Sequence, residues 1–322
     1  MTIAFFEITE FEKEKFKLAF SNQKLLFFEN TLQEVDINEF KEASIISIFV
    51  HSKANKLILE KLPKLSLIST RSTGIDHIDL DYCKEKNIEV KNVPFYGENT
   101  VAEHTFALIL ALSRKIHSSY IRSLKGDFST EGLQGFDLQD KTIGIIGGGR
   151  IGLHVARIAK GFGMHVRVYD IKKEDFLAEL INFKYVSLEE LYQTSDIISL
   201  HVPLNKYTTH MINKDSLKNF KKGALLINTA RGALVNTDDL IQAIDKGIIT
   251  GAGLDVIEGE ELLIEENIFN LPIEKAAKLI VNSKLLLDNE NVVITPHNAF
   301  NSLEAVNRII NTTIKNIERS NI

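Results

Sequence analysis

Arg231, Glu260 and His297 each follow a short apolar stretch in the second half of the sequence, and their side chains suit one kind of reaction. A histidine can donate a proton near neutral pH, and a carboxylate bonded to its far nitrogen would stabilise the charged ring. An arginine can hold a substrate carboxylate through two parallel hydrogen bonds and polarise the carbonyl beside it. Reduction of a 2-oxo acid needs such groups, because a hydride is added to the carbonyl carbon while a proton must reach the oxygen.

Each of these residues taken alone has a simpler explanation. An arginine can form a surface ion pair, a glutamate is usually solvated, and one histidine among nine is more often structural than catalytic. Their positions argue for more, because ligands of open α/β sheets bind beyond the carboxyl ends of the strands. Arg231, Glu260 and His297 follow such ends, as does Asp255. We therefore predict that they converge on one edge of a sheet.

Six predicted strands, joined by helices, must position these residues. The first, 143–146, is short and rich in β-branched residues, as expected for a strand that is buried on both faces. The others cover 164–169, 196–202, 224–228, 251–256 and 292–295. Six parallel strands with crossover helices form a full doubly wound dinucleotide-binding domain.

Gly147, Gly149 and Gly152 follow the first of these strands with the spacing G-x-G-x-x-G. In such a turn the first glycine allows the tight bend, the second lets the backbone approach a pyrophosphate, and the third lets the helix pack closely on the strand. The N-terminus of that helix offers unpaired N–H groups to the phosphates. Asp170 ends the next strand, where its carboxylate can accept from the ribose hydroxyls and repel a 2′-phosphate. The sequence therefore predicts NAD as cofactor in preference to NADP, although Lys172 and Lys173 just beyond Asp170 could weaken that preference.

The first part of the chain predicts a second, smaller parallel sheet. Short apolar strands at 3–6, 24–28, 45–50, 67–70 and 89–91 alternate with amphipathic helices. A helical pattern at 303–317 is too short for a domain, and we expect it to return to this first half. The predicted fold class is α/β with two doubly wound parallel-sheet domains, a Rossmann NAD-binding domain (100–296) being inserted into a flavodoxin-like substrate domain (1–99 plus 297–322).

Thr100 and Glu103 form a predicted capping box at the start of one long helix that reaches about Lys125. The helix is apolar nearly all round over 106–112, which indicates burial between domains or between subunits. We favour the second possibility and predict a homodimer formed through the helix at 100–125.

Composition excludes several classes of function. A net charge of −5 over 322 residues gives no basic footprint for nucleic acid or for an anionic membrane. Cys83 is the only cysteine, so neither an intrachain disulfide nor a thiolate metal cluster is possible, and no His/Cys/Asp cluster has the spacing of a metal site. The N-terminus has acidic residues where a secretory signal would need basic ones, so we expect a cytoplasmic protein.

From about residue 65 onward the sequence resembles the D-isomer-specific 2-hydroxyacid dehydrogenases. The matching stretches are TRSTGIDHIDL (70–80), NVPFYGENTVAEHT (92–105), the glycine turn, HVP (201–203), INTARG (227–232), GAGLDVIEGE (251–260) and TPHNAF (295–300). The resemblance implies Arg231 as substrate binder, Glu260 as the partner of the histidine and His297 as proton donor. Glu260 rather than Glu258 matches, because its spacing from Asp255 is that of the family motif.

The resemblance also implies the remaining contacts of cofactor and substrate. Backbone N–H groups around Thr73 and Gly74 would hold the substrate carboxylate, and Asp255 would lie beside the nicotinamide. Besides the glycine turn, the residues expected along the cofactor are Arg150, Ile151, His201, Val202, Pro203, Thr208, Thr229, Ala230 and Arg231.

Within this family the likeness is greatest to the D-lactate dehydrogenase branch. Tyr96 and Phe300 would leave a small pocket suited to pyruvate, although two such aromatics can equally be core residues. The long segment 261–291 also fits that branch. His51 departs from the pattern, because an aromatic side chain is expected there to face the substrate.

Two alternatives to a D-lactate dehydrogenase stay open. One is a 3-phosphoglycerate or glyoxylate/hydroxypyruvate dehydrogenase of the same fold, for which Lys53 and Arg71 could bind a phosphate. The absence of a further domain after His297 counts against the long phosphoglycerate type. The other is an NAD-sensing binding protein similar to the C-terminal-binding corepressors. The presence of Arg231, Glu260 and His297 disfavours it.

Overall fold

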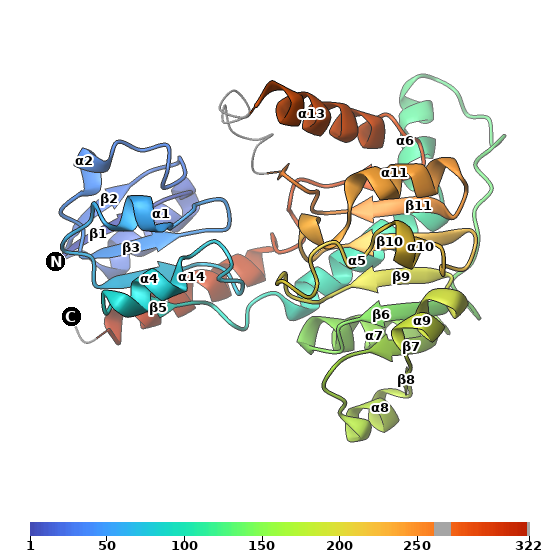
Figure 1. The fold of residues 1–322 in the computed structure, drawn as a ribbon, viewed down its shortest axis with the longest axis horizontal. Helices are drawn as coiled ribbons and strands as arrows, with labels where there is room; N and C mark the ends of the chain where they lie inside the picture. Colours follow the sequence, from blue (N-terminus) through green and yellow to red (C-terminus); the bar gives the residue numbers. More distant parts are fainter. Residues whose placement is uncertain (261–271, 321–322) are drawn as a thin grey trace. The chain divides into compact units, whose positions relative to one another are not determined.

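The chain forms two compact units, shown in Figure 1. The computed structural model describes residues 1–260 and 272–320. The first unit contains residues 1–96 and 302–322, and the second contains 97–301. The two crossings lie a few residues from the predicted ones, so that His297 belongs to the second unit.

Five parallel strands form the sheet of the first unit, in the order β2-β1-β3-β4-β5 that is typical of flavodoxin-like folds. They are β1 (Thr2–Phe5), β2 (Lys24–Phe27), β3 (Ile45–Ile48), β4 (Leu67–Thr70) and β5 (Glu89–Lys91). β3 ends earlier than predicted because the carboxylate of Glu7 accepts from the backbone N–H groups of Phe49, His51 and Ser52, which turns the chain away from the sheet.

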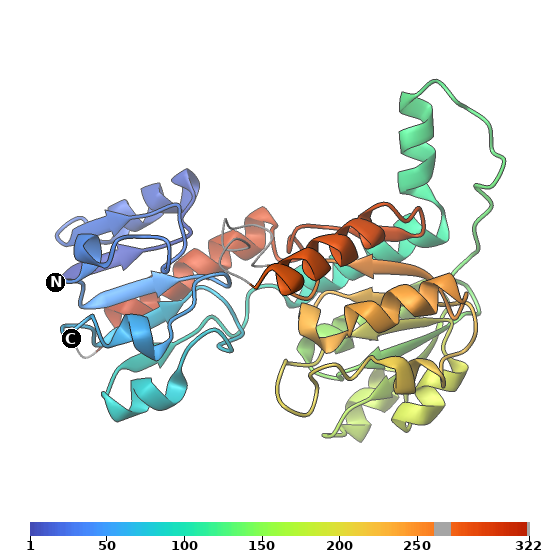
Figure 2. The same cartoon turned by 45° about the horizontal axis from the view of Figure 1, so that its top comes forward.

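Helices cover both faces of this sheet. Ile3 and Phe5 point to one face, where they pack with Ile310 and Ile317 of α14 (Leu303–Glu318). The intervening Ala4 and the following Phe6 point to the other face. The first face is covered by α14 and α1 (Glu10–Ala19), and the second by α2 (Ile37–Phe40), α3 (Lys56–Leu59) and α4 (Leu80–Glu85). The predicted return of the last helix to the first half is confirmed, because α14 contacts α1 and β4. Figures 1 and 2 show this helix running along the first unit.

The sheet of the second unit has the strand order β12-β11-β10-β9-β6-β7-β8 in the part of the chain that is described. All neighbouring strands are parallel. The strands are β6 (Thr142–Ile146), β7 (His165–Tyr169), β8 (Lys184–Tyr185), β9 (Ile197–Leu200), β10 (Ala224–Asn228), β11 (Ile249–Leu254) and β12 (Val292–Ile294). The first six in chain order have the Rossmann arrangement 3-2-1-4-5-6. The six predicted strands are present, and the two-residue edge strand β8 was not predicted because it is too short for a hydrophobic period.

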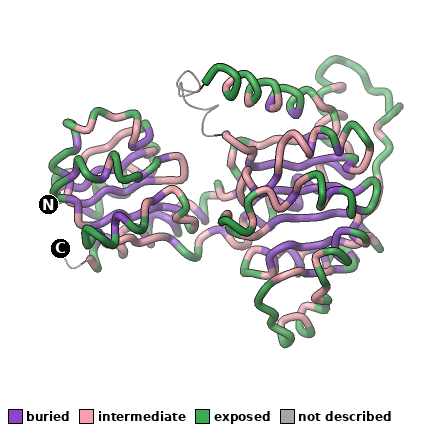
Figure 3. The backbone as a smooth tube through the Cα atoms, in the orientation of Figure 1, coloured by how far each residue is buried: buried purple, intermediate pink, exposed green. Residues whose placement is uncertain are grey.

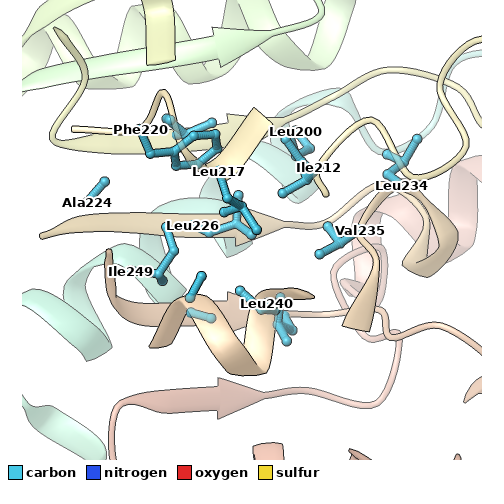
Figure 4. Packing of buried hydrophobic residues seen from close by; sticks show 14 of the residues in the cluster. Leu200, Ile212, Leu217, Phe220, Ala224, Leu226, Leu234, Val235, Leu240 and Ile249 are labelled. Carbon is cyan, nitrogen blue, oxygen red and sulfur yellow. The ribbon is translucent and has the colours of Figure 1, made fainter. Parts of the chain in front are cut away.

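Two apolar layers sandwich this second sheet. Ile143 and Ile145 of β6 face the layer under α5 (Glu98–Ser113) and α7 (Arg150–Gly161), whereas Ile146 faces the opposite layer. Figure 4 shows that opposite layer around β10, and Figure 3 shows buried strands between more exposed helices. The helices of that layer are α9 (Leu188–Thr194), α10 (Lys214–Leu217) and α11 (Thr237–Asp245), while α8 (Asp175–Ile181) follows β7 and α13 (Ile273–Leu287) precedes β12.

The predicted helix over 100–125 is wrong in two respects. It begins at Glu98 with Gly97 as N-cap, and Glu103 accepts a hydrogen bond from the side chain of Asn99, so Thr100 does not form the expected capping box. It also ends at Ser113, because Lys115 has a left-handed backbone (φ +52°), and a second helix, α6 (Ile116–Leu124), follows.

Most apolar residues of α5 belong to the core of its own unit. Phe106, Leu108, Ile109 and Leu112 are buried in the core of their own unit, where α5 packs on α7 and β11. Exposed apolar side chains occur instead on α6, which projects from the sheet of the second unit in both Figure 1 and Figure 2. Among the described helices, none has the length and apolar character that a membrane crossing would require.

Candidate active site

The glycine turn of the second unit is held by close backbone approaches. Gly147 has φ +104°, and a Cβ on it would lie 2.4 Å from the carbonyl oxygen of His201. A Cβ on Gly152 would lie 2.0 Å from the carbonyl oxygen of Gly147. Both positions therefore require glycine. Gly149 differs, because no described atom lies within 4 Å of the place of its Cβ, so the space over this residue is open.

This turn fits a dinucleotide. Gly149 is the N-cap of α7, and no described side chain caps that helix, so its first N–H groups can bind a pyrophosphate in the open space. Asp170 Oδ2 accepts from Gly148 N at 2.6 Å and Oδ1 from Lys172 N at 2.8 Å. A carboxylate has about four acceptor sites, which leaves acceptors for two ribose hydroxyls. Arg150 and Ile151 form the first turn of α7 behind the glycines.

The loop after β9 forms the opposite wall of the turn. His201 packs its backbone on Gly147, and its Nε2 lies 2.8 Å from Ser199 Oγ. Burial lowers the pKa of His201 to about 3, so this histidine is neutral at physiological pH and cannot serve as a cation for phosphate. Thr208 Oγ1 donates to the carbonyl of Pro203 at 2.6 Å, which closes the loop that follows β9. The side chain of Val202 lies next to Gly147 of the glycine turn.

A buried asparagine shapes the turn that carries Arg231. Asn228, at the end of β10, accepts from Ala230 N at 3.1 Å and donates to the carbonyl of Arg231 at 2.9 Å. Arg231 Nη1 donates to the carbonyl of Ala230 at 2.8 Å. Thr229 lies 3.1 Å from Thr105 of α5, hydroxyl to hydroxyl. These bonds fix the whole 228–231 turn at the carboxyl edge of the sheet.

Glu260 and His297 form a hydrogen-bonded pair at the same edge. Their Oε1 and Nδ1 atoms are 2.7 Å apart, and the side chains are 18% and 15% exposed. Glu260 Oε2 accepts from Ile257 N at 3.0 Å, which orients the carboxylate. The carboxylate fixes Nδ1 as the protonated ring nitrogen, so Nε2 is the atom on which a proton could be exchanged. Glu258 takes no part, because it bonds to His210 and Thr237.

Asp255 holds the loop that carries His297. Its carboxylate accepts from Thr295 Oγ1 (2.5 Å), Asn298 N (2.8 Å) and Ala299 N (2.9 Å), and its backbone oxygen accepts from His297 N (2.8 Å). Burial of this side chain opposes ionisation, but the close contact with His104 and the hydrogen bonds from Thr295 and the two amides outweigh it and hold the pKa of Asp255 below its usual range. Asp255 is therefore an anion at neutral pH.

Gly232 joins two parts of the site. A Cβ on it would lie 2.2 Å from the backbone carbon and oxygen of Ile257 and 2.5 Å from Glu258 N. The turn of Arg231 is thus in direct contact with the loop that leads to Glu260. No individual role was predicted for Asn228, Gly232 and His104, although they lie within the matched stretches 227–232 and 92–105. A polar residue ending a fully buried strand was the available signal for Asn228.

The remaining predicted substrate residues lie on both units. In the first unit Thr73 Oγ1 donates to the carbonyl of Val93 at 2.9 Å, and Ser72 Oγ donates to the carbonyl of Gly74 at 2.7 Å, so the 72–74 turn is fixed by its side chains. The carbonyl of Tyr96 accepts from Arg308 at 2.7 Å. Phe300 is half-buried in the second unit. No group of three or more potential metal ligands occurs among residues 1–260 and 272–320.

Comparison with known proteins decides the family. Residues 106–299 match the model of the NAD-binding domain of the D-isomer specific 2-hydroxyacid dehydrogenases. The chain belongs to this family. Its activity is accordingly that of an NAD-dependent 2-hydroxyacid dehydrogenase, whose substrate is a small molecule and whose cofactor fits the glycine turn described above.

Similar proteins differ in their named substrates. A D-lactate dehydrogenase of Aquifex aeolicus, solved with NAD and lactic acid, superposes with a TM-score of 0.90 at 40% identity and covers 98% of this chain and 94% of its own. The D-lactate dehydrogenase of Escherichia coli is 36% identical over 91% of this chain and 88% of its own. An aromatic 2-oxoacid reductase of Clostridium sporogenes is 40% identical over 85% of this chain and 81% of its own.

Replacing Gly232 by alanine tests whether the contact with Ile257 positions the site. We expect Gly232→Ala to lower kcat by about 10²-fold, because displacement of a reacting group by about 1 Å costs that much. NADH affinity, measured by fluorescence titration, should change less than about threefold, since the glycine turn is untouched. Gly161→Ala is the matched control, because its added Cβ meets no described atom within 4 Å. Equal kcat values for the parent and Gly232→Ala would contradict this account.

Proposed function

We propose that this dehydrogenase interconverts a small D-2-hydroxy acid and its 2-oxo acid, and that D-lactate and pyruvate are its preferred pair. The observation that carries the proposal is the 2.7 Å bond between Glu260 and His297 at the edge where the turn of Arg231 also ends. A carboxylate–imidazole pair together with a guanidinium is the donor set that a 2-oxo acid needs.

In the proposed mechanism Arg231 binds the substrate carboxylate and polarises the adjoining carbonyl. Bound NADH supplies the hydride. His297, protonated on both nitrogens, donates the Nε2 proton to the carbonyl oxygen, and Glu260 stabilises the imidazolium through Nδ1. In the reverse direction neutral His297 accepts the hydroxyl proton. The backbone N–H groups of Thr73 and Gly74 donate further hydrogen bonds to the substrate carboxylate. Tyr96 and Phe300 limit the size of the substrate side chain.

The choice of D-lactate rests on similarity and on pocket residues. The similar proteins from Aquifex aeolicus and Escherichia coli are D-lactate dehydrogenases, at 40% and 36% identity. An aromatic substrate is the second candidate, because the reductase of Clostridium sporogenes is as similar in identity, and because His51 replaces the expected aromatic side chain.

A screen of 2-oxo acids with NADH tests the substrate. We expect kcat/KM for pyruvate to exceed the values for glyoxylate, hydroxypyruvate and phenylpyruvate by about tenfold or more, as pocket size typically discriminates by this much. In the oxidative direction D-lactate should react and L-lactate should not. A higher kcat/KM for phenylpyruvate would replace pyruvate by an aromatic substrate, and no turnover of any 2-oxo acid would contradict the proposed reaction.

Removal of the proton donor tests the mechanism. His297→Ala should lower kcat by about 10²–10⁴-fold, the usual contribution of a positioned acid or base. NADH affinity should stay within about threefold of the parent value, because the ring contacts Glu260 and not the glycine turn. His165→Leu, on the exposed end of β7, controls for loss of a histidine. A His297→Ala variant with parental kcat would refute this assignment.

We further propose that the protein is a homodimer held through α6. Ile116, Tyr120, Ile121 and Leu124 recur at helical spacing and are all exposed, and Phe128 beyond the helix is 82% exposed. Apolar rows of this kind on a projecting helix are typical of subunit interfaces. The base of the helix is fixed, because Lys115 Nζ donates to Asn291 Oδ1 at 2.6 Å.

Light scattering tests the dimer. The parent protein should show twice the chain mass of 36.3 kDa at micromolar concentration, and Ile121→Glu should show a single chain mass because a charge would be buried in the interface. Leu18→Glu, at an exposed leucine of α1, is the control and should stay dimeric. A parent protein of single chain mass would disprove the dimer.

A further inference from the structure

His104 of α5 reaches into the hydrogen-bond network of the site. Its Nε2 lies 3.0 Å from Thr295 Oγ1 and 3.3 Å from Asp255 Oδ1. The side chain is 19% exposed and that of Asp255 only 1%. A polar ring beside a buried anion is a strong interaction, because the surrounding low dielectric amplifies it.

The direction of these hydrogen bonds follows from the number of protons available. Asp255 is ionised and can only accept, so Thr295 must use its single hydroxyl proton to donate to Asp255 Oδ1. The oxygen of Thr295 then accepts from His104, which requires a proton on Nε2 of the ring. The chain of donors therefore runs from His104 through Thr295 to Asp255.

The acceptor sites of Asp255 divide between two tasks. Oδ1 accepts from Thr295 and from Asn298 N, and so holds the loop that carries His297. Oδ2 accepts from Ala299 N, which leaves it one further acceptor site. A carboxamide N–H donor of the nicotinamide is the group in the proposed reaction that such an oxygen would take.

We propose that His104 is a positioning residue that, through Thr295, fixes the orientation of the Asp255 carboxylate. Oδ1 is thereby kept on the catalytic loop and Oδ2 is kept available for the carboxamide of the cofactor. The assignment of the carboxamide rests on the proposed function, whereas the effect on the 297–299 loop does not. His104 acts through Asp255 and touches neither substrate nor cofactor in this role.

Hydrogen exchange of the protein without cofactor tests the effect on the loop. We expect His104→Leu to raise the exchange rates of the Asn298 and Ala299 amides by about tenfold, because their acceptor is no longer held in place. His104→Gln, which keeps an N–H donor near the position of Nε2, should restore slow exchange. Exchange over α11 should be the same in all variants. Unchanged protection of the two amides in His104→Leu would overturn the proposal.

Cofactor analogues test the effect on Asp255 Oδ2. The KM for NADH should rise about tenfold in His104→Leu and recover in His104→Gln, whereas kcat should fall less. With reduced 3-acetylpyridine adenine dinucleotide, whose ketone has no N–H to donate, the same substitution should change KM less than about twofold. His165→Leu should behave as the parent with both cofactors. Equal rises in KM for the two cofactors would refute the carboxamide role and leave a purely structural one.

These measurements separate the inference from the proposed function. If the parent protein turns over no 2-oxo acid, the proposed reaction fails, while NADH binding and amide exchange still test His104. If the parent is active and His104→Leu alters neither amide protection nor the difference between the two cofactors, the reaction stands and the role of His104 is disproved.

Discussion

Parallel pairing of β10, β11 and β12 is the constraint on which the site depends. Their register sets Asn228 beside Leu254 and Leu254 beside Ile294, so the three strands end level with one another. Because neighbouring strands are about 4.8 Å apart, the segments that leave these ends are forced into proximity. Arg231, Glu260 and His297 come from the three segments that follow these strands. Antiparallel pairing of any one strand would send its polar residue to the opposite edge.

Direct backbone-to-backbone contacts at three glycines position the loops that follow the strands. Gly147, Gly152 and Gly232 each stand where a methyl group would collide with another backbone segment. These contacts connect the first strand to the loop after β9, and the turn of Arg231 to the loop of Glu260. The loops of the site are therefore positioned by backbone contact as well as by hydrogen bonds. Because the loops of such a rigid site are already ordered, little conformational entropy of the protein is lost when a ligand binds.

The fold was largely predictable because parallel strands buried on both faces are continuous apolar runs, and the glycine spacing marks where the first of them ends. Local patterns failed where the deciding interaction is not local. The break at Lys115 is a single left-handed residue, and Thr100 lost its expected cap role because the helix starts earlier, at Glu98. The pairing of Glu260 with His297 was predicted from a motif. The hydrogen bond between His104 and Thr295 joins segments far apart in sequence, which no spacing rule reveals.

The return of α14 to the first sheet has a consequence for synthesis on the ribosome. Ile3, Phe5 and Phe16 share a core cluster with Ile310 and Ile317, so one face of that sheet is completed only by α14, which is synthesised after the whole second unit. Until residues 97–301 have been translated, part of the apolar face of the first sheet lacks the helix that covers it. The inserted unit has no such dependence and can mature first. Vectorial synthesis therefore makes the N-terminal unit the last to be finished, and the one that needs protection from aggregation while it waits.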